Sequence, residues 1–258
     1  MLTLICFALK EEAAPFRKIA AGIGLHRGHH VSILLTGIGR QNAEKNLHEF
    51  LAGGASVPAS REHTSICQAR LARTLAPPDL VLTCGFAGGL NPDLKLGEVV
   101  FALLNRRDEF HESQTEKEIA DLIGDSRSSS LQEKLIASGA KPAKFFCADR
   151  ITTTVAEKKK LRAETGADAV EMESAAIHAV CAERGIRCVT VRVISDTANE
   201  NLPLDFNALA KPDKNLDYGK LFLAIAKSPG KVGALLELQK KTKFAAEQLA
   251  DVLAEIIA

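Results

Sequence analysis

The sequence is organised around two segments, Ala169-Val170-Glu171-Met172-Glu173-Ser174-Ala175-Ala176 and Val191-Arg192-Val193-Ile194-Ser195-Asp196-Thr197-Ala198. Both are apolar runs that end in carboxylates. A carboxylate at the end of a buried strand has to be solvated, paired or used in chemistry, because burying it alone is costly. We interpret these carboxylates as functional.

The first segment marks the change from a strand to a helix. Residues 167–172 alternate small or apolar side chains with acids, as a strand does. Apolar side chains then recur at helical spacing up to Gly185, which stands where the end of a helix is expected. Glu173 is therefore expected at the strand-to-helix junction.

The second segment has the composition of a central strand. Residues 187–194 are rich in β-branched side chains, which suits a sheet covered on both faces, and Asp196 falls just past their end. Ligands of open α/β sheets bind at the carboxyl ends of strands, so the pattern places Glu171, Glu173 and Asp196 at one crevice. A purely structural alternative stays open, in which Glu173 complements a helix dipole and Asp196 is a turn residue.

The N-terminal region repeats the arrangement of a strand followed by acids. Residues 2–8 are expected to form a buried strand, and Glu11 and Glu12 to open a helix that contains Pro15. Acids in a first helical turn also suit the helix dipole, so the pattern alone does not make Glu12 functional.

Glycine-rich runs follow two further strands. Residues 31–35 lead into Thr36-Gly37-Ile38-Gly39 and a helix over 40–52, and residues 79–83 lead into a glycine-rich turn over 84–90. Such glycines let the backbone approach a ligand, although tight-turn chemistry explains each run alone. The third glycine of the dinucleotide fingerprint is missing, so no nicotinamide site is predicted.

The remaining segments complete an alternating pattern of strands and helices. They are a surface loop over 53–63, a helix over about 64–75, a turn over 91–98 that feeds a strand, a strand over 144–148, and helices over about 218–227 and 232–257. Residues 105–130 are polar and serine-rich and are expected to form a loop or lid. Residues 149–153 would border the pocket, and the last two helices would pack outside the sheet or serve a subunit interface.

Length and composition exclude several classes of protein. The chain has 258 residues, 46% of them hydrophobic, and its patterns alternate without a break, so one α/β domain over residues 1–258 is expected. The formal charge is +1 with acids and bases mixed along the chain. No basic footprint favours a nucleic-acid partner.

Cysteines, histidines and the N-terminus indicate the compartment. Six scattered cysteines make no CxxC pair and seven histidines show no ligand spacing, so neither a disulfide framework nor a metal site is expected. Residues 1–8 are apolar but short and lack the basic region of a signal peptide, and no apolar stretch reaches membrane-spanning length. We expect a soluble, cytoplasmic protein.

Taken together, these motifs resemble those of the purine nucleoside phosphorylase and nucleosidase superfamily, and most of all its methylthioadenosine/S-adenosylhomocysteine nucleosidases. The matching motifs occur in the family's order over about residues 1–210: Thr36-Gly37-Ile38-Gly39, Gly85-Phe86-Ala87-Gly88-Gly89-Leu90, Val170-Glu171-Met172-Glu173 and Ile194-Ser195-Asp196. The resemblance implies a three-layer α/β/α fold with a central mixed twisted sheet. It also implies a purine nucleoside as substrate, no cofactor, and a homodimer whose subunits complete each other's pockets.

The resemblance implies a role for each site residue. Asp196 matches the acid that protonates N7 of the purine so that the base can leave, and Glu12 matches the acid that deprotonates the attacking water. An acid in the first role has to keep a proton, which burial beside other acids would favour. Glu173 matches the carboxylate that grips the ribose hydroxyls. The other implied substrate contacts are Met172, Glu171, Ser195, Gly85 and Phe86 around the sugar, and backbone groups of Ile151 and Thr152 against the base.

Charge favours hydrolysis over phosphorolysis. Phosphorylases of the superfamily hold phosphate with arginines, whereas this chain has Glu11, Glu12 and Thr83 at the corresponding places. A carboxylate at the nucleophile position repels phosphate and suits water. Arg40 could still supply one positive charge, so a phosphate-dependent phosphorylase stays an alternative.

Two departures from the nucleosidases leave other interpretations open. Phe86 stands where those enzymes usually have a small hydroxyl residue, and the 105–130 segment and the two-part helical extension at about 211–258 differ from compact nucleosidases. These features resemble the superfamily's hopanoid-associated members, which are connected with release of adenine from an adenosylated lipid precursor. A nucleoside-binding protein without turnover is the remaining alternative, although binding alone does not require Glu12.

Overall fold

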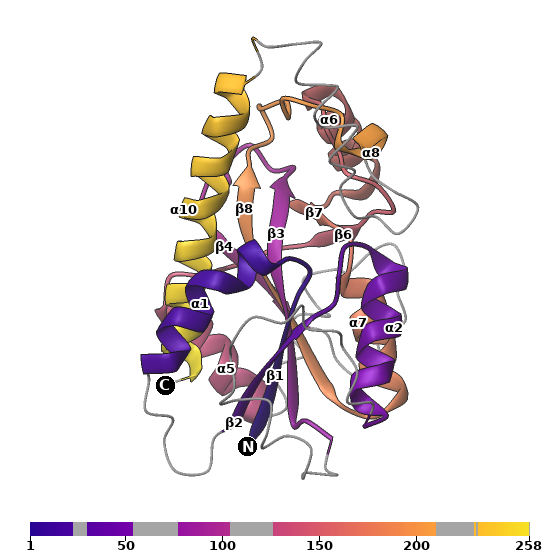
Figure 1. Cartoon of the computed structure of the whole chain (residues 1–258), viewed down its shortest axis with the longest axis vertical. Helices are drawn as coiled ribbons and strands as arrows, with labels where there is room; N and C mark the ends of the chain where they lie inside the picture. Colours follow the sequence, from indigo (N-terminus) through magenta and orange to yellow (C-terminus); the bar gives the residue numbers. More distant parts are fainter. Residues whose placement is uncertain (23–29, 54–76, 104–125, 210–229, 231, 258) are drawn as a thin grey trace.

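A central sheet with helices on both faces forms the protein (Figure 1). The structure is a computed structural model that describes residues 1–22, 30–53, 77–103, 126–209, 230 and 232–257. Within these ranges the sheet has eight strands. They are β1 (Leu2–Phe7), β2 (His30–Leu35), β3 (Leu80–Gly89), β4 (Val99–Leu103), β5 (Lys141–Pro142), β6 (Phe145–Cys147), β7 (Ala169–Glu171) and β8 (Arg187–Asp196). The helices are α1 (Lys10–Gly22), α2 (Arg40–Leu51), α5 (Ser126–Ala137), α6 (Val155–Thr165), α7 (Ser174–Glu183), α8 (Phe206–Leu209) and α10 (Val232–Ile257).

Parallel pairing brings the carboxyl ends of the main strands to one edge of the sheet. The main path runs β2-β1-β3-β8-β4-β5. Strands β2, β1, β3 and β8 are parallel, whereas β4 runs antiparallel to β8 and β7 antiparallel to β3. The predicted mixed α/β sheet is therefore confirmed, and the ends of β1, β3 and β8 lie side by side where such sheets bind ligands.

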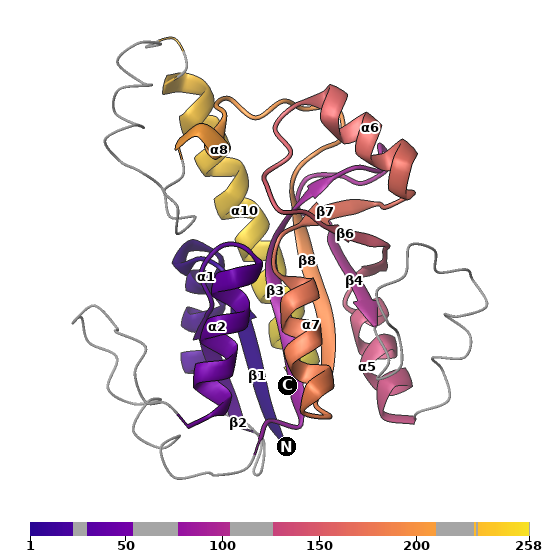
Figure 2. The same cartoon turned by 90° about the vertical axis from the view of Figure 1, so that its right-hand side faces the viewer.

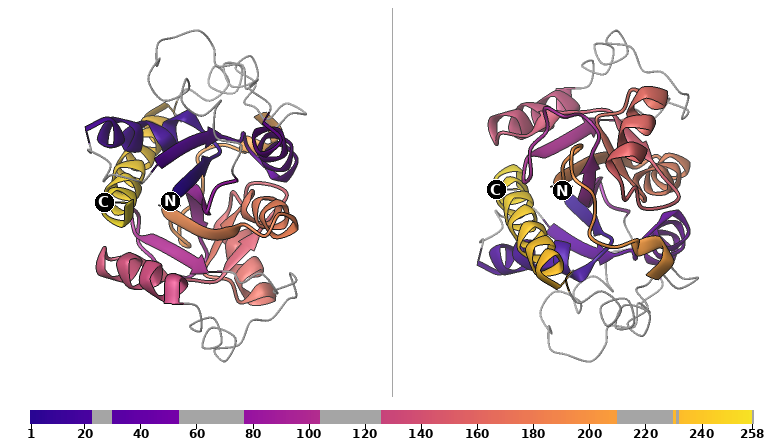
Figure 3. Two further views of the ribbon diagram at one scale, coloured as in Figure 1. Left: turned by 90° about the horizontal axis from the view of Figure 1, so that it is seen from below. Right: turned by 90° about the horizontal axis from the view of Figure 1, so that it is seen from above.

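Helices cover the sheet on both faces, as Figures 2 and 3 show from three further directions. Helix α10 packs against α1, α5 and strand β8 on one face, and α2 packs against α7 on the other. Helix α6 lies beyond the carboxyl ends of β3 and β8 (Figure 1). The elements that close the carboxyl-end edge are therefore separate from those that cover the core.

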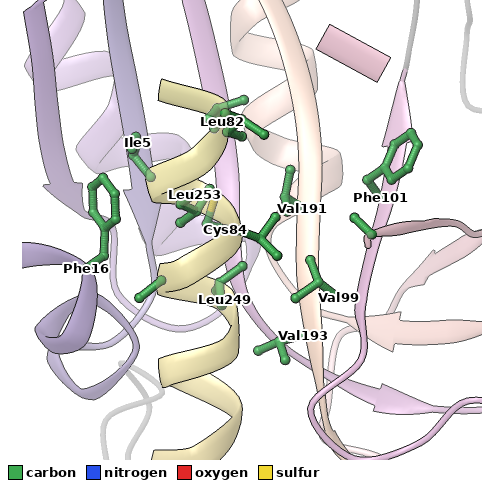
Figure 4. Packing of buried hydrophobic residues seen from close by; sticks show 14 of the residues in the cluster. Ile5, Phe16, Leu82, Cys84, Val99, Phe101, Val191, Val193, Leu249 and Leu253 are labelled. Carbon is green, nitrogen blue, oxygen red and sulfur yellow. The ribbon is translucent and has the colours of Figure 1, made fainter. Parts of the chain in front are cut away.

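Strand alternation divides the apolar side chains between two cores. In β1, Ile5 and Phe7 join one cluster and Leu4 and Cys6 join the other, because successive side chains of a strand point to opposite faces. The first cluster lies between the sheet, α1 and α10 (Figure 4), and the second between the sheet, α2 and α7. The predicted C-terminal helix is confirmed over 232–257, and its residue Leu253 is fully buried in the first cluster.

Strand β3 is longer than the sequence predicted. The interpretation of residues 84–90 as a turn is wrong, because β3 continues to Gly89 and pairs there with β7 while β8 continues beside it. A Cβ at Gly88 would lie 3.3 Å from a carboxylate oxygen of Asp196. The glycines therefore let the strand pass closely under a buried carboxylate, a usual reason for glycine inside a strand.

A second correction concerns the polar segment predicted as a loop over 105–130. Residues 126–130 instead begin α5. Serine is an indifferent helix former, so the serine-rich composition pointed to a loop, and the turn is helical because the rest of α5 packs on α10 and β4. The predicted helices over about 64–75 and 218–227, residues 54–63 of the first loop and residues 105–125 lie outside the described residues.

Two findings bear on the expected compartment. In the part of the chain that the structure describes, no helix has the length and apolar character needed to cross a membrane. Cys6, Cys84, Cys147, Cys181 and Cys188 are buried and carry free thiols.

Candidate active site

The candidate active site is built around Arg192, which lies in the middle of β8 and is 1% exposed. Its Nη2 donates to Glu171 Oε2 at 2.6 Å, and its Nη1 lies 3.4 Å from Glu173 Oε2. The guanidinium also donates to Thr83 Oγ1 at 3.1 Å and to the Cys84 carbonyl at 3.3 Å, both on β3. A buried guanidinium needs such partners because it cannot release its proton.

Glu171, the last residue of β7, is the carboxylate that anchors Arg192. Its Oε2 accepts from the backbone N–H groups of Glu173 at 2.9 Å and Ser174 at 2.8 Å, and its Oε1 accepts from Ser174 Oγ at 2.5 Å. Burial raises the pKa of Glu171, but Arg192 and these hydrogen bonds outweigh it and hold the pKa below its ordinary value. The anionic form of Glu171 is therefore favoured, and it orients the guanidinium.

Glu173 occupies the N-cap position of α7, at the strand-to-helix junction that the sequence predicted, although its side chain makes no capping hydrogen bond. Its Oε1 accepts from the Gly39 N–H at 2.9 Å, so the glycine turn before α2 donates to a carboxylate of the site. Burial, helped by the nearby carboxylates of Glu171 and Glu12, raises the pKa of Glu173 to about 7, although Arg192 lowers it in part. Glu173 can therefore gain or lose a proton near neutral pH.

Glu12 lies in the first turn of α1 and reaches the same cluster. Its Oε1 accepts from the Phe86 N–H at 2.9 Å and its Oε2 from the Leu9 N–H at 2.9 Å. Burial raises the pKa of Glu12 above its ordinary value, although these hydrogen bonds and Arg192 lower it in part. One guanidinium thus faces three carboxyl groups, and of these only Glu171 has its pKa lowered from the ordinary value.

Gly85 lets Glu12 and Arg192 approach each other. A Cβ at this position would lie 2.7 Å from Glu12 Oε1 and 2.8 Å from Arg192 Nη1, and the backbone has φ of +147°. Both the space and the backbone angle therefore require glycine. The glycine-rich run that the sequence singled out serves the site by its missing side chain.

Asp196, the last residue of β8, has different neighbours from those predicted. Its Oδ1 accepts from Ser195 Oγ at 2.8 Å, and its Oδ2 forms a hydrogen-bonded ion pair with the Nζ of Lys158 on α6. The sequence had predicted other acids beside it, but Glu171 and Glu173 bind Arg192, four residues earlier on the strand. The register between β3 and β8 shifts at this point, because Ala87 pairs with Ile194 and Gly88 pairs with Asp196.

The backbone of Ile151 is already hydrogen-bonded. Its N–H donates to Asn207 Oδ1 at 2.9 Å, and its carbonyl accepts from Asn207 Nδ2 at 2.8 Å. Asn207 belongs to the short helix α8, whose first turn is held by Asp205 Oδ1 accepting from the Asn207 N–H at 3.0 Å. The peptide predicted to meet a base therefore holds a side-chain amide in this structure.

The other predicted site residues border the cluster. Met172 and Thr152 are half-buried, and the side chain of Phe86 packs against the core under α1 and α10. Arg40 donates to the Cys147 carbonyl, and its Nε lies 3.3 Å from Asp149 Oδ1. Its charge is thus already paired at the rim.

Sequence reasoning missed two residues at the centre of this arrangement, Arg192 and Lys158. An arginine between two valines in a β-branched run signals a buried charge that has to find a carboxylate, so Arg192 was open to prediction. Lys158 stands in a run of three lysines, and only the fold distinguishes it from the exposed Lys159 and Lys160.

Comparison with known proteins gives consistent results. A family model described as the phosphorylase superfamily matches residues 6–257. The chain is similar to the 5′-methylthioadenosine/S-adenosylhomocysteine nucleosidase of Shewanella halifaxensis, with 30% identity over 183 residues, covering 62% of this chain and 77% of that protein. The nucleosidase of the same description from Shewanella oneidensis is 30% identical over 190 residues, covering 62% and 76%.

Solved structures show the same fold. The futalosine hydrolase of Helicobacter pylori matches with a TM-score of 0.61 at 18% identity, over 100% of this chain and 97% of that one. The 5′-methylthioadenosine/S-adenosylhomocysteine nucleosidase of Campylobacter jejuni matches with a TM-score of 0.60 at 16% identity, over 99% and 98%. With a family model that spans nearly its whole length, the chain belongs to the phosphorylase superfamily.

Proposed function

We propose that the protein is a purine nucleosidase that uses water to break the N-glycosidic bond of an adenosine-type nucleoside. The observation that carries the proposal is a pair of buried carboxyl groups. Glu12 lies just after the carboxyl end of β1, and Asp196 is the last residue of β8, the strand that also carries Arg192. The relatives described as 5′-methylthioadenosine/S-adenosylhomocysteine nucleosidases support that substrate class.

The two carboxyl groups take opposite proton-transfer roles. Asp196 donates a hydrogen to N7 as the bond between N9 and C1′ breaks, so the purine leaves as a neutral base. Glu12 accepts the proton of the water that adds to C1′. Its raised pKa makes it a stronger base once ionised, which suits this role.

Glu173 binds the sugar between these two groups. A carboxyl near the ribose accepts hydrogen bonds from the hydroxyls, and as an anion it stabilises the positive charge that develops on the sugar. Arg192 limits that anionic charge and fixes Glu173 against the site. Met172 packs against the sugar, Ser195 orients Asp196 by its hydrogen bond, and Phe86 and Gly85 supply the N–H and the space that position Glu12.

The backbone of Ile151 and Thr152 receives the base. Adenine presents an amino donor beside a ring acceptor. The carboxamide of Asn207, which is hydrogen-bonded to the N–H and the carbonyl of Ile151, presents the same pattern. A base at this place has to displace Asn207.

The charge of the site favours water over phosphate. The guanidinium of Arg192 is engaged by Glu171 and Glu173, and Glu12 stands where the nucleophile would approach. A phosphate dianion there would meet carboxylates without a free cation in the described cluster.

The test is release of free base from methylthioadenosine, S-adenosylhomocysteine, adenosine and inosine, each with and without phosphate. We expect phosphate-independent release of adenine. Strict phosphate dependence would make the protein a phosphorylase, and no release from any of the four would point to a larger 5′ substituent or to binding alone.

The Asp196→Asn variant tests the mechanism within that assay. The amide keeps the shape of the side chain but cannot donate the hydrogen in the same way, so kcat is expected to fall by about 10²–10⁴-fold. Asp93→Asn, on an exposed turn, is the matched control and should leave kcat unchanged. Wild-type turnover in Asp196→Asn would remove Asp196 from the mechanism.

Three properties of the whole protein complete the proposal. We propose that residues 1–258 form one domain, since α10 packs on the sheet that begins with β1. A cytoplasmic location is supported by the buried free thiols, which a reducing compartment preserves. A homodimer is supported by Leu236 and Phe244 of α10, which are large apolar side chains that stay exposed in one chain.

A further inference from the structure

Lys158 is a fully buried lysine beside the proposed acid. It is 0% exposed, and its Nζ donates to the Asp196 carboxylate and to the carbonyls of Thr197 at 2.6 Å and Glu200 at 3.0 Å. An ammonium has three hydrogens, so these acceptors use all of them. Asp196 is the only charged partner of Lys158 among the described residues.

The start of α6 fixes this lysine in place. Thr154 and Glu157 form a capping box, with Thr154 Oγ1 accepting from the Glu157 N–H at 3.2 Å. Lys158 follows one residue later and faces the end of β8, whereas Lys159 and Lys160 face solvent. The helix thus selects one of three consecutive lysines for the interior.

Stability does not explain a buried charge here. Replacing a buried ion pair by apolar side chains of similar volume is often neutral or stabilising, because desolvation offsets the attraction. A methionine would fill the same space next to the strand. The ammonium therefore points to a role in the chemistry of Asp196.

We propose that Lys158 and Asp196 work as one proton-donating unit, in which the buried ammonium supplies the hydrogen that Asp196 passes to the leaving base. The inference rests on the proposed nucleosidase function and deepens it. Of the two residues, only Asp196 would contact the purine. Lys158 acts through Asp196 and is therefore a positioning residue and a proton source.

The proton transfer balances as follows. As the bond between N9 and C1′ breaks, its electron pair passes into the purine and N7 forms a bond to the hydrogen on Asp196. That hydrogen comes from Lys158 Nζ, so Asp196 ends as the carboxylate that it was in the ion pair and Lys158 ends as a neutral amine. The positive charge stays on the sugar until water adds and Glu12 takes the water's proton. Solvent then returns one proton to Lys158 and receives one from Glu12.

Few other charged groups surround the pair. The loop after β8 carries Glu200, whose carboxylate binds Lys241 of α10 at 2.5 Å. On the β3 side, Gly88 faces Asp196 and brings no charge. The rest of β8 contributes Arg192, which is engaged by Glu171 and Glu173. Lys158 is therefore the charged side chain that contacts Asp196 among the described residues.

The pH profile of kcat in Lys158→Met tests the proposal. In the wild type the proposal has Lys158 supply the hydrogen, whereas in the variant Asp196 has to take it from solvent. We expect the alkaline limb to move to lower pH by more than about 2 units. At pH 8 the variant kcat should be about 100-fold below wild type, and at pH 5.5 less than about tenfold below.

Two further variants separate charge from structure. Lys158→Gln can still donate to the carbonyls of Thr197 and Glu200 but carries no charge, and it should show the same shifted limb. Lys160→Met removes an exposed lysine from the same helix and should keep the wild-type profile. An equal loss of kcat at every pH in both Lys158 variants would mean a merely structural lysine and would overturn the proposal.

The remaining outcomes are also decisive. Should neither Lys158 variant fold, the wild-type profile decides, because the proposal predicts that kcat stays level between pH 6 and 8. A decline of the wild-type kcat between pH 6 and 8 would contradict the proposal that Lys158 and Asp196 act as one proton-donating unit. Failure of the nucleosidase proposal would show differently, as absence of base release from the wild type at any pH.

Discussion

Gly85 sets how closely the acid and the guanidinium of the site approach. An alanine there would place its Cβ within 3 Å of Glu12 Oε1 and Arg192 Nη1, so these two side chains would have to move. We expect Gly85→Ala to lower the free energy of unfolding by about 1–3 kcal/mol, as overpacking does. We expect a larger effect on turnover, about 100-fold in kcat, because the displaced atoms include the proposed base.

The control for this substitution is Gly139→Ala. Gly139 also has positive φ, +85°, but no atom lies within 4 Å of the Cβ that alanine would add. The control therefore measures backbone strain alone, and its kcat should stay at the wild-type value. Chemical denaturation and base-release kinetics on both variants make the comparison. Equal activity in the two variants would show that Glu12 tolerates displacement.

At the scale of elements, predictability followed the strength of the side-chain pattern. Strand β8 and helix α10 were predicted over nearly their observed ranges, because β-branched residues mark the first and helical apolar spacing the second. Strand β3 was cut short at residue 83, since glycines carry no side chain that shows a period. Its continuation depends on pairing with β7 and β8, which are distant in sequence.

Helix α8 yields a prediction about substrate binding. If the base uses the Ile151 backbone, binding has to break the two hydrogen bonds that Asn207 makes there. Each such bond is worth about 1 kcal/mol net, so the two together predict that Asn207→Ala lowers KM by about 30-fold while kcat stays nearly constant. Steady-state kinetics with the best of the four nucleosides measures this.

The matched control is Asn201→Ala. Asn201 lies in the segment between β8 and α8. Its Oδ1 accepts from the Val155 N–H at 2.7 Å, so it connects that segment to α6 without a hydrogen bond to Ile151. Its loss should leave KM unchanged or raise it. A raised KM in Asn207→Ala would reverse the interpretation and make the amide a support for the base.

At the scale of the whole molecule, the site charges were the part that sequence could not assign. The carboxylates Glu12, Glu173 and Asp196 were named from their places after strands, a rule that holds because parallel strands end at one edge. Their cations were not named, since the partnership of Glu171 with Arg192 and of Asp196 with Lys158 arises from packing across 21 and 38 residues of chain. Pairing of buried charges is a property of the completed fold.

The same cluster should make the stability of the folded molecule depend on pH. Glu173 has a folded pKa of about 7 against an ordinary value of 4.5, because burial favours its neutral form. Its contribution to stability is therefore fully present below about pH 4.5 and is lost as the pH rises to about 7, where the unfolded chain ionises first. The total loss is about 3 kcal/mol.

Glu173→Gln isolates this contribution. The amide cannot ionise, so the difference in unfolding free energy between wild type and variant should shift by about 3 kcal/mol in favour of the variant from pH 4.5 to 7.5. Glu12 and Glu171 titrate in both proteins and cancel in that difference to first order. Urea unfolding at four pH values measures it, with the exposed Glu164→Gln as control. Parallel stability curves for wild type and Glu173→Gln would mean that Arg192 holds two anions in the fold, and the sugar would then meet a fixed charge throughout the neutral range.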